Sequence, residues 1–450
     1  MIFKRIKQLF KSNDKRNRIL RNNIMFSAVL KIIGLSCSLL IVPITLNYLN
    51  NEVYGIWLTM SSILYWFSFF DIGLGNGMRN YLTQAISNGN YELGRSYLST
   101  TLFMLFIVAI IIAVIAIVPM SMLNLNKVFN TNEISGDALR NVMIVAVTFT
   151  LALFVVKNIG FVFVALQKYA YNDLLLVSGN IISLFIIYVL TKTTEGNLMY
   201  VVMAFTITPV IVFLLASIPI FIKYPQLKPS IKSIDKSLGH QIVGKGLGFF
   251  FIQITSCLVI YGSSNLFIIQ FCGPSSVTVY NIAYKYFNLI AIAYTIVISP
   301  MWNAYTDAYV KGEIQWISHT FNHALKMWGI TVVGGLIMLA ISGVFYHLWI
   351  GESVVIPFGV SASVLAYISM FNLNNCATSL LNGLNIIRVQ IYTSFLFTAF
   401  FLIVIILLGK YFGFIGIISS MAISYGLMSM IHLYQCRLLI TQKAKGIWKK

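Results

Sequence analysis

The sequence has few charged residues for its length. Of its 450 residues only 10% are Asp, Glu, Lys or Arg, whereas 58% are hydrophobic, and the mean hydropathy is +0.85. An average soluble domain carries about 25% charged residues. The composition therefore excludes an ordinary soluble globular protein. It indicates a polytopic helical membrane protein, because apolar runs of about 20 residues recur along the chain.

Acidic residues are scarcer still. There are 12 Asp and Glu against 31 Lys and Arg, which gives a formal net charge of +19. In a soluble chain this excess would suggest nucleic-acid binding. Here the basic residues lie mainly between hydrophobic runs, so membrane topology explains them and no nucleic-acid partner is expected.

Enzyme and metal motifs are missing. The five cysteines are scattered without a CxxC pair, and no P-loop, HExxH or GxSxG sequence occurs. His319 and His323 are four residues apart, but no acidic or cysteine partner shares their turn, so no metal site is expected. These absences favour a transporter over an enzyme.

The hydrophobic runs predict about twelve transmembrane helices in an all-α protein. In the first half the predicted spans are Phe26–Asn47, Val53–Phe70, Leu98–Leu123, Ala138–Leu166, Asn172–Leu190 and Leu198–Ile222. In the second half they are Val243–Phe271, Val277–Tyr305, Ala324–Ser342, Pro357–Leu381, Val389–Leu408 and Phe414–Tyr434.

The distribution of basic residues predicts the orientation. If the amino terminus is cytoplasmic, twenty-five Lys and Arg lie on the cytoplasmic side and four lie outside, namely Lys127, Arg140, Lys192 and Lys410. This asymmetry predicts cytoplasmic termini. The expected organisation is a basic tail (1–25), a six-helix lobe (26–222), a basic cytoplasmic loop (223–242), a second six-helix lobe (243–436) and a basic tail (437–450).

A short motif is repeated in the two halves. It follows the second span of each half, as Asn80, Thr83, Ala85 and Gly89 in the first and Asn303, Thr306, Ala308 and Gly312 in the second. With six spans each, both halves enter the membrane from the same side. We therefore expect a pseudo-two-fold axis along the membrane normal and a central cavity between the lobes.

The end of the second span is the first candidate site. Asp71 directly follows an apolar run and Arg79 lies eight residues later. Charges there are costly unless they pair with each other or meet water or a ligand, so an internal ion pair and a substrate contact are both open. Glycines bend helices, and prolines inside spans kink them. The expected hinge residues are Gly73, Gly75, Gly77, Pro43 and Pro300.

Lysines inside other spans form a second candidate group. Lys31 lies early in the first span, and Lys285 lies about two turns inside the eighth. Asn281 and Asn288 flank Lys285 at helical spacing and so share its face. A central lysine costs about 2.5–3.5 kcal/mol, so Lys285 should face a polar cavity or an acid. Lys31 could instead extend to the lipid headgroups.

The tenth span is unusually rich in polar residues. It carries Asn372, Asn374, Asn375, Ser379 and Asn382. Two explanations remain open: hydrogen bonds between helices or the lining of a wet cavity. Under the second, Asn372 and Asn375 would contact the substrate.

The first hundred residues resemble a known family. The segments LNNEVYGIW (49–57) and FDIGLGNG (70–77), with LNG at 381–383, are similar to the polysaccharide flippases. These are the Wzx-type O-antigen and capsule repeat-unit transporters of the multidrug/oligosaccharidyl-lipid/polysaccharide exporter superfamily. The resemblance in length, helix number and halves extends over the whole chain.

The resemblance implies a function. Two six-helix lobes would alternate access to a cationic cavity and flip an undecaprenyl-pyrophosphate-linked oligosaccharide from the cytoplasmic to the outer leaflet of the bacterial inner membrane. Lys31, Arg79 and Lys285 would bind the pyrophosphate. The expected partners are the lipid bilayer and, as candidates, a polysaccharide polymerase and a chain-length regulator. No cofactor is implied; the coupling ion, H⁺ or Na⁺, is left open.

Three alternatives compete with this function. A cation-coupled drug antiporter of the same superfamily should carry more acid within its spans than Asp71 alone. A lipid II flippase would differ mainly in cargo. A membrane polysaccharide polymerase or acyltransferase usually needs a sizeable loop, but the longest expected outside loop, Asn124–Asp137, is short and has no histidine.

The basic-residue asymmetry generates a topology prediction. Reporter fusions after Lys228 and at Lys450 should be cytoplasmic, and a fusion after Lys127 should be external. An external carboxy terminus would contradict the twelve-helix topology.

Overall fold

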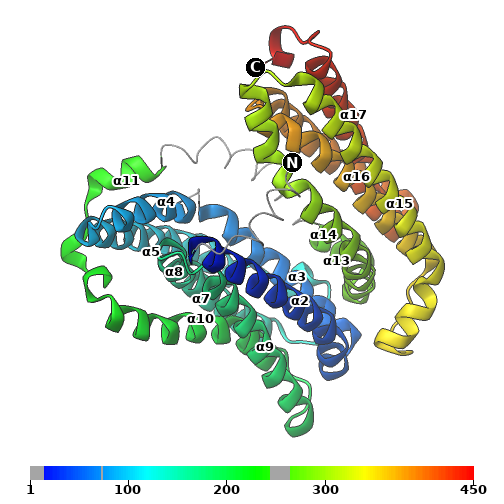
Figure 1. Ribbon diagram of the computed structural model, residues 1–450. Coiled ribbons are helices and arrows are strands. Elements are labelled where there is room, and N and C mark those ends of the chain that lie inside the picture. The colour runs from blue at the N-terminus through cyan, green and yellow to red at the C-terminus, as the bar shows by residue number, and fades with distance from the viewer. Residues whose placement is uncertain (1–14, 72–73, 244–263, 450) are drawn as a thin grey trace. The chain divides into compact units, whose positions relative to one another are not determined.

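The fold is helical throughout the part of the chain that is described. The computed structural model describes residues 15–71, 74–243 and 264–449, and within these ranges no strand occurs (Figure 1). The predicted all-α polytopic architecture is confirmed.

Eight helices in the described ranges are long and apolar enough to cross a membrane. They cover Met25–Leu49, Tyr91–Met122, Gly136–Ala165, Ala170–Thr193, Leu198–Lys223, Pro274–Val310, Ile314–Ile350 and Arg388–Ile440. The last is 53 residues long and contains two predicted spans, because the backbone turns at Gly413 with a φ of +56°. The predicted span Val243–Phe271 lies mostly outside the described residues.

Two other predicted spans are absent from this set. The second is shorter than expected, since α3 (Asn51–Trp66) ends before the predicted limit at Phe70. The tenth corresponds to α16 (Phe358–Gly383), which has 26 residues but whose asparagines lower its hydropathy. A span can thus be long enough and still be too polar for a hydropathy criterion.

The chain forms two compact units. The first comprises Met1–Asn50, Leu64–Asn126 and Ile134–Phe250, and the second comprises Asn51–Ile63, Lys127–Glu133 and Phe251–Lys450. Helix α3 is therefore divided between them. The lobe boundaries and the symmetry axis expected from the sequence remain predictions.

The first unit is built from amphipathic and apolar helices. Its elements are α2 (Lys15–Leu49), η1 (Phe67–Asp71), α4 (Leu74–Ser87), α5 (Tyr91–Met122), α7 (Gly136–Val156), α8 (Gly160–Ala165), α9 (Tyr169–Thr193), α10 (Leu198–Lys223) and α11 (Lys236–Val243). Helix α2 packs on α9, α4 on α5 and α8, and α7 on α5 and α10. Met78, Leu82, Leu98 and Val162 are fully buried in the core that α4, α5 and α8 share.

Besides residues Asn51–Ile63 of α3, the second unit contains the short helix α13 (Ser264–Cys272) and four long helices. The long helices are α14 (Pro274–Val310), α15 (Ile314–Ile350), α16 and α17 (Arg388–Ile440), which pack together. Gly55 of α3 lies so close to the Pro274 backbone that a Cβ would overlap its carbonyl. Thr278 adds a 2.7 Å hydrogen bond from its hydroxyl to the Asn51 carbonyl. The glycine of the YGIW segment is therefore required by close helix contact.

The repeated sequence motif has the same structure in both units. Gly89 ends α4 and Gly312 ends α14, each in the left-handed region, with φ of +74° and +72°. The hydrogen bonds that close the two turns correspond: Gly89 N to Ile86 O, Asn90 N to Ala85 O, Gly312 N to Tyr309 O and Glu313 N to Ala308 O. This is the glycine-terminated helix end that satisfies the last free carbonyls. The internal repeat thus has a physical basis at this turn.

A second pair of helix ends matches as well. Gln167 after α8 and Asn385 after α16 have φ of +62° and +58°. In each case the next residue's N–H bonds back into the preceding helix, Lys168 to Phe163 O and Ile386 to Leu381 O. The halves therefore share two corresponding turns.

The segment between the two halves is fastened to α5. The Asp235 N–H donates to the Thr100 hydroxyl at 2.9 Å, and the Ser230 N–H donates to the Ser99 hydroxyl at 3.0 Å. The Asp235 carboxylate accepts from the Ser237 N–H and hydroxyl, which hold the pKa of that carboxyl below its usual range. The contribution of this cap to stability is present at neutral pH and is lost as acid protonates Asp235.

We expect Thr100→Val to release this segment. The isosteric change removes the acceptor of the Asp235 N–H, and one hydrogen bond contributes about 1 kcal/mol, so local opening should rise about fivefold. Trypsin cleavage after Lys232 and Lys236, measured in detergent by mass spectrometry, should accelerate by this factor. Thr193→Val is the control, because that hydroxyl bonds only within its own helix; equal cleavage in both variants would contradict the prediction.

Candidate functional site

The stretch predicted to be a hinge does interrupt the helix. A 3-10 turn, η1, follows α3, and α4 begins just after it. Gly75 and Gly77 lie in the first turn of α4. Gly73 and the side chain of Asp71 lie outside what is described, so the expected pairing of Asp71 with Arg79 is not tested. Short 3-10 stretches between helices often mark hinges, and hinge motion here stays a prediction.

Two arginines lie on neighbouring helices of the first unit. Arg79 is half-buried on α4, and Arg95 is half-buried in the second turn of α5. The Nε of Arg95 is buried and has no hydrogen-bond partner among the described residues. A buried guanidinium nitrogen without an acceptor is costly and suits an anionic ligand. Arg95 was not predicted from the sequence, because it precedes the hydrophobic run that begins at Leu98, and the structure extends this helix back to Tyr91.

Lys285 and its two asparagines lie where their spacing predicted. Asn281, Lys285 and Asn288 are all half-buried on α14. Asn281, however, already has partners: its Nδ2 donates to Asn265 Oδ1 at 2.9 Å and to Val277 O at 2.8 Å. This asparagine is therefore used for helix packing.

The Asn281 contact continues into α3. The Asn265 Nδ2 donates to the Ser62 hydroxyl and, at 3.3 Å, to the Leu58 carbonyl. Three elements of the second unit, α3, α13 and α14, are thus joined by one polar network. Such networks replace the hydrogen bonds to water that are lost inside a membrane.

Tyrosines surround the same part of the second unit. The rings of Tyr280 and Tyr284 are stacked at 5.9 Å, Tyr284 and Tyr367 at 6.3 Å, and Tyr367 and Tyr425 are 5.8 Å apart. Only Tyr284 is half-exposed; the other three are buried. The cluster is mainly a packing feature that holds α14, α16 and α17 together next to Lys285.

The asparagines of α16 have different environments. Asn372 is fully buried, and neither its oxygen nor its nitrogen has a hydrogen-bond partner among the described residues. Asn375 is half-buried. Asn382 accepts from Gln390 Nε2 at 3.1 Å. Asn382 thus bonds between helices, as the first explanation expects, whereas Asn372 has unused hydrogen-bonding capacity, and the second explanation stays a prediction for Asn372 and Asn375.

One histidine of the second unit is buried among polar groups. His432 of α17 is 1% exposed; its Nδ1 lies 2.8 Å from Asn374 Oδ1, and its Nε2 lies 2.9 Å from Thr393 Oγ1. No local sequence pattern indicates this group, because the three residues come from three distant segments.

Three further predicted residues lie apart from these groups. Lys31 is exposed on α2, and Pro43 and Pro300 lie inside α2 and α14. Exposure of Lys31 is compatible with contact to headgroups and with contact to a ligand, so both explanations stay open.

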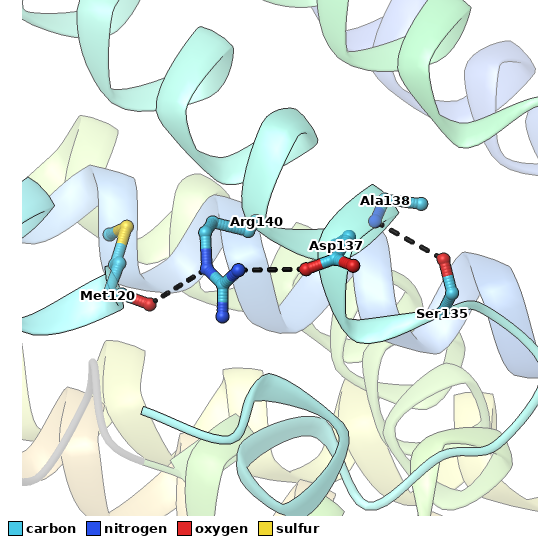
Figure 2. A network of polar contacts seen from close by, with 5 residues as sticks. All are labelled: Met120, Ser135, Asp137, Ala138 and Arg140. Atoms are coloured by element: carbon cyan, nitrogen blue, oxygen red, sulfur yellow. Dashed lines mark hydrogen bonds and ion pairs between the residues drawn. The ribbon is translucent and has the colours of Figure 1, made fainter. Parts of the chain in front are cut away.

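Arg140, at the end predicted to be external, makes one ion pair and one hydrogen bond to the backbone (Figure 2). Its Nη1 is 2.8 Å from the Asp137 carboxylate, and its Nε donates to the Met120 carbonyl at 3.2 Å. The Ala138 N–H donates to the Ser135 hydroxyl, which caps α7. This network joins the end of α5 to the start of α7.

A cavity of about 430 Å³ lies within the first unit, between α2 and α9. It is lined by Ile44, Asn47, Tyr48, Tyr188, Thr191, Lys192, Thr194 and Gly196. The Tyr48 hydroxyl bonds the Thr194 hydroxyl at 2.8 Å, and the Lys192 ammonium lies 5.9 Å from the Tyr188 ring. None of the predicted site residues lines this cavity.

Among the residues described above, the first unit contributes arginine side chains, and the second unit contributes a lysine together with amide and phenol groups. Charges of this kind bind phosphate, and amides and phenols bind sugar hydroxyls. No group of three metal-ligating side chains occurs among the residues that the structure describes.

Comparison with known proteins supports a transporter. No family model matches the chain. Two proteins named as candidate O-antigen transporters, from Salmonella typhimurium and Salmonella typhi, are each 21% identical, over 71% and 70% of this chain and of their own length.

Solved structures show the same fold. An inward-facing MATE family transporter of the MOP superfamily superposes with a TM-score of 0.73 over 93% of this chain and 98% of its own, at 14% identity. The lipid II flippase MurJ, in an inward closed conformation, gives 0.69 over 92% and 87%, at 13% identity. At such identities the structural likeness establishes the fold only. The resemblance found in the sequence is confirmed: the chain is similar to two proteins that are named as O-antigen transporters, and it has the fold seen in MATE family transporters and in MurJ.

Proposed function

We propose that this protein is a flippase that moves an undecaprenyl-pyrophosphate-linked oligosaccharide from the cytoplasmic to the outer leaflet of the bacterial inner membrane. The proposal rests chiefly on one observation. The relatives over some 70% of the chain are named for O-antigen transport, and the fold is that of membrane transporters. The chemistry of the described residues is compatible with this cargo.

The pyrophosphate requires cations. Arg79 and Arg95 on α4 and α5, Lys31 on α2 and Lys285 on α14 are the candidates for contacting it. Charge-assisted hydrogen bonds to phosphate are about twice as strong as neutral ones. Asn281 already bonds Asn265, so we expect it to position α14 and not to contact the cargo. Asn288, Asn372 and Asn375 remain candidates for contacting the saccharide.

A drug antiporter remains the second candidate, because MATE transporters share the fold. The acid that such a protein would need inside its spans is scarce. Within the described helices of the second unit, Asp307 on α14 is exposed and pairs with Lys311 at 2.6 Å. This arrangement favours the anionic, lipid-linked cargo.

Deletion of the gene tests the function. The surface polysaccharide should be lost and lipid-linked repeat units should accumulate on the cytoplasmic leaflet, while drug susceptibility and peptidoglycan synthesis stay unchanged. In sealed vesicles, the fraction of saccharide that is protected from the impermeant oxidant periodate measures the leaflet in which the saccharide lies. If the lipid-linked unit is never assembled, the protein acts earlier, as an enzyme; if drug susceptibility alone changes, it is an antiporter.

The second test concerns Lys285. If its ammonium contacts the pyrophosphate, Lys285→Ala and Lys285→Gln should reduce transport at least about tenfold, because a charged hydrogen bond contributes about 1.5–3 kcal/mol. Lys285→Arg should retain much of the activity, since a cation is kept. Polysaccharide export is measured at matched protein level.

Lys326→Ala is the matched control, because Lys326 is exposed on neighbouring α15. If Lys285 only stabilises the unit, Lys285→Ala should lower protein abundance, and Arg should behave no better than Gln. Normal export by Lys285→Gln would remove this residue from the binding site.

A further inference from the structure

The cavity between α2 and α9 of the first unit, which we call the α2–α9 pocket, has no part in the proposed transport. Two helix faces and a loop build it. Each helix contributes three residues at the spacing of one helix face, namely Ile44, Asn47 and Tyr48 from α2 and Tyr188, Thr191 and Lys192 from α9. Thr194 and Gly196 of the following loop complete the lining.

The two helices run parallel, so the faces that line the pocket continue together away from it. A Cβ at Gly34 would lie 3.4 Å from the Val177 side chain, and further along both helices the Tyr48 hydroxyl lies 2.8 Å from the Thr194 hydroxyl. The pocket therefore lies at the carboxyl ends of both helices. The asymmetry of basic residues predicts these ends to be external.

The same helix faces carry exposed apolar side chains below the pocket. On α9, Ile181 and Phe185 precede Tyr188 by two turns and one turn, and they are 40% and 65% exposed. On α2, Leu40 precedes Ile44 by one turn and is 53% exposed. A surface that is apolar along its length and polar at one end has the pattern of an amphipathic lipid, with acyl chains beside the apolar part and a headgroup at the polar end.

Two oxygens of the pocket are left as hydrogen-bond acceptors. Thr191 donates its hydroxyl proton to the Tyr188 carbonyl at 2.7 Å, and Thr194 donates its own to the Leu190 carbonyl at 3.0 Å. The Tyr48 hydroxyl must therefore donate to the Thr194 oxygen. Lone pairs of the Thr191 and Tyr48 oxygens then face the pocket without a proton of their own to give, which suits a ligand that carries hydroxyl groups.

The pocket carries one positive charge. The Lys192 ammonium lies 5.9 Å from the centre of the Tyr188 ring, and none of the residues that line the pocket is acidic. Glu195 belongs to the same loop but does not line the pocket. A negatively charged headgroup is therefore favoured over a zwitterionic one, whose ammonium would come close to Lys192. Tyrosine and lysine side chains at helix ends commonly lie at the level of lipid headgroups.

We propose that the α2–α9 pocket binds an anionic phospholipid with a hydroxyl-bearing headgroup. The phosphate contacts the Lys192 ammonium, the headgroup hydroxyls donate to the Thr191 and Tyr48 oxygens, and the acyl chains lie along the exposed apolar faces of α2 and α9. This proposal rests neither on the transport function nor on the side of the membrane.

The affinity is measured on the intact protein in detergent by native mass spectrometry. The probes are phosphatidylglycerol and, as the zwitterionic comparison, phosphatidylethanolamine with the same acyl chains. The wild type should bind phosphatidylglycerol more tightly. Lys192→Gln should lower the affinity for phosphatidylglycerol about fivefold, the usual contribution of one lysine near an anionic lipid surface. Lys192→Arg should keep the affinity, because it keeps the cation.

Lys410→Gln is the matched control, because Lys410 is exposed on α17 and is also predicted to be external. It should leave the binding of phosphatidylglycerol unchanged. An equal loss in Lys192→Gln and Lys410→Gln, or a wild type that does not prefer phosphatidylglycerol, overturns the proposal.

Photocrosslinking tests the position of the lipid. Phosphatidylglycerol with a diazirine in one acyl chain should label peptides from α2 and α9. Thr191→Phe should reduce this labelling, because the ring fills the pocket and the lost hydroxyl bonded only within α9. Thr193→Phe is the control, since Thr193 also bonds within α9 but does not line the pocket. Labelling that Thr191→Phe leaves unchanged overturns the site.

Competitors in the same reaction separate a phospholipid from other phosphate compounds. Glycerol phosphate has the headgroup chemistry without acyl chains, and undecaprenyl pyrophosphate represents the cargo lipid. At the concentration of the labelled phospholipid, neither should reduce the labelling of α2 and α9. Displacement by glycerol phosphate would assign the pocket to a soluble phosphate ester, and displacement by undecaprenyl pyrophosphate would make it a cargo site; either result overturns the proposal.

Discussion

A buried polar group is costly unless it is hydrogen-bonded where no water can reach it, and several helix contacts of the second unit depend on this constraint. Asn265 and Asn281 carry amides into a helical region, and together with Ser62 they hold α3, α13 and α14 in one register. Asn374 and Thr393 do the same for the His432 ring. Each network is worth more as a unit than as single bonds, because a lost partner leaves an expensive orphan in a low-dielectric interior.

The same constraint shapes the helix ends. An α-helix leaves its last carbonyls unpaired, and a left-handed residue lets the chain turn back and bond them. Gly89 and Gly312 perform this at corresponding turns of the two halves, and Gln167 and Asn385 do so at another pair. The residues that the two halves of the sequence share thus coincide with a turn that needs a left-handed backbone conformation.

The fold alone does not select a cargo, since drug transporters and a lipid II flippase share it. The polar residues in its helices bear on this choice. Arginine and lysine are half-buried on α4, α5 and α14, whereas Asp307 is exposed and already paired. Half-buried cations suit a cargo that brings its own negative charge.

The sequence by itself determined the membrane class, most helices and the positions of the turns. Segment length and hydropathy predict spans because the bilayer thickness is fixed, and glycine at Gly89 and Gly312 marks left-handed turns because other residues are strained there. It also placed Asn281, Lys285 and Asn288 on one face, a consequence of the helical period. Local periodicity, however, does not say which helix a face will meet. Only the tertiary structure decided that Asn281 is already bonded, that Arg95 has a buried unpaired nitrogen, and that His432 meets Asn374 and Thr393. Those contacts join residues far apart in the chain, so they depend on how the helices pack.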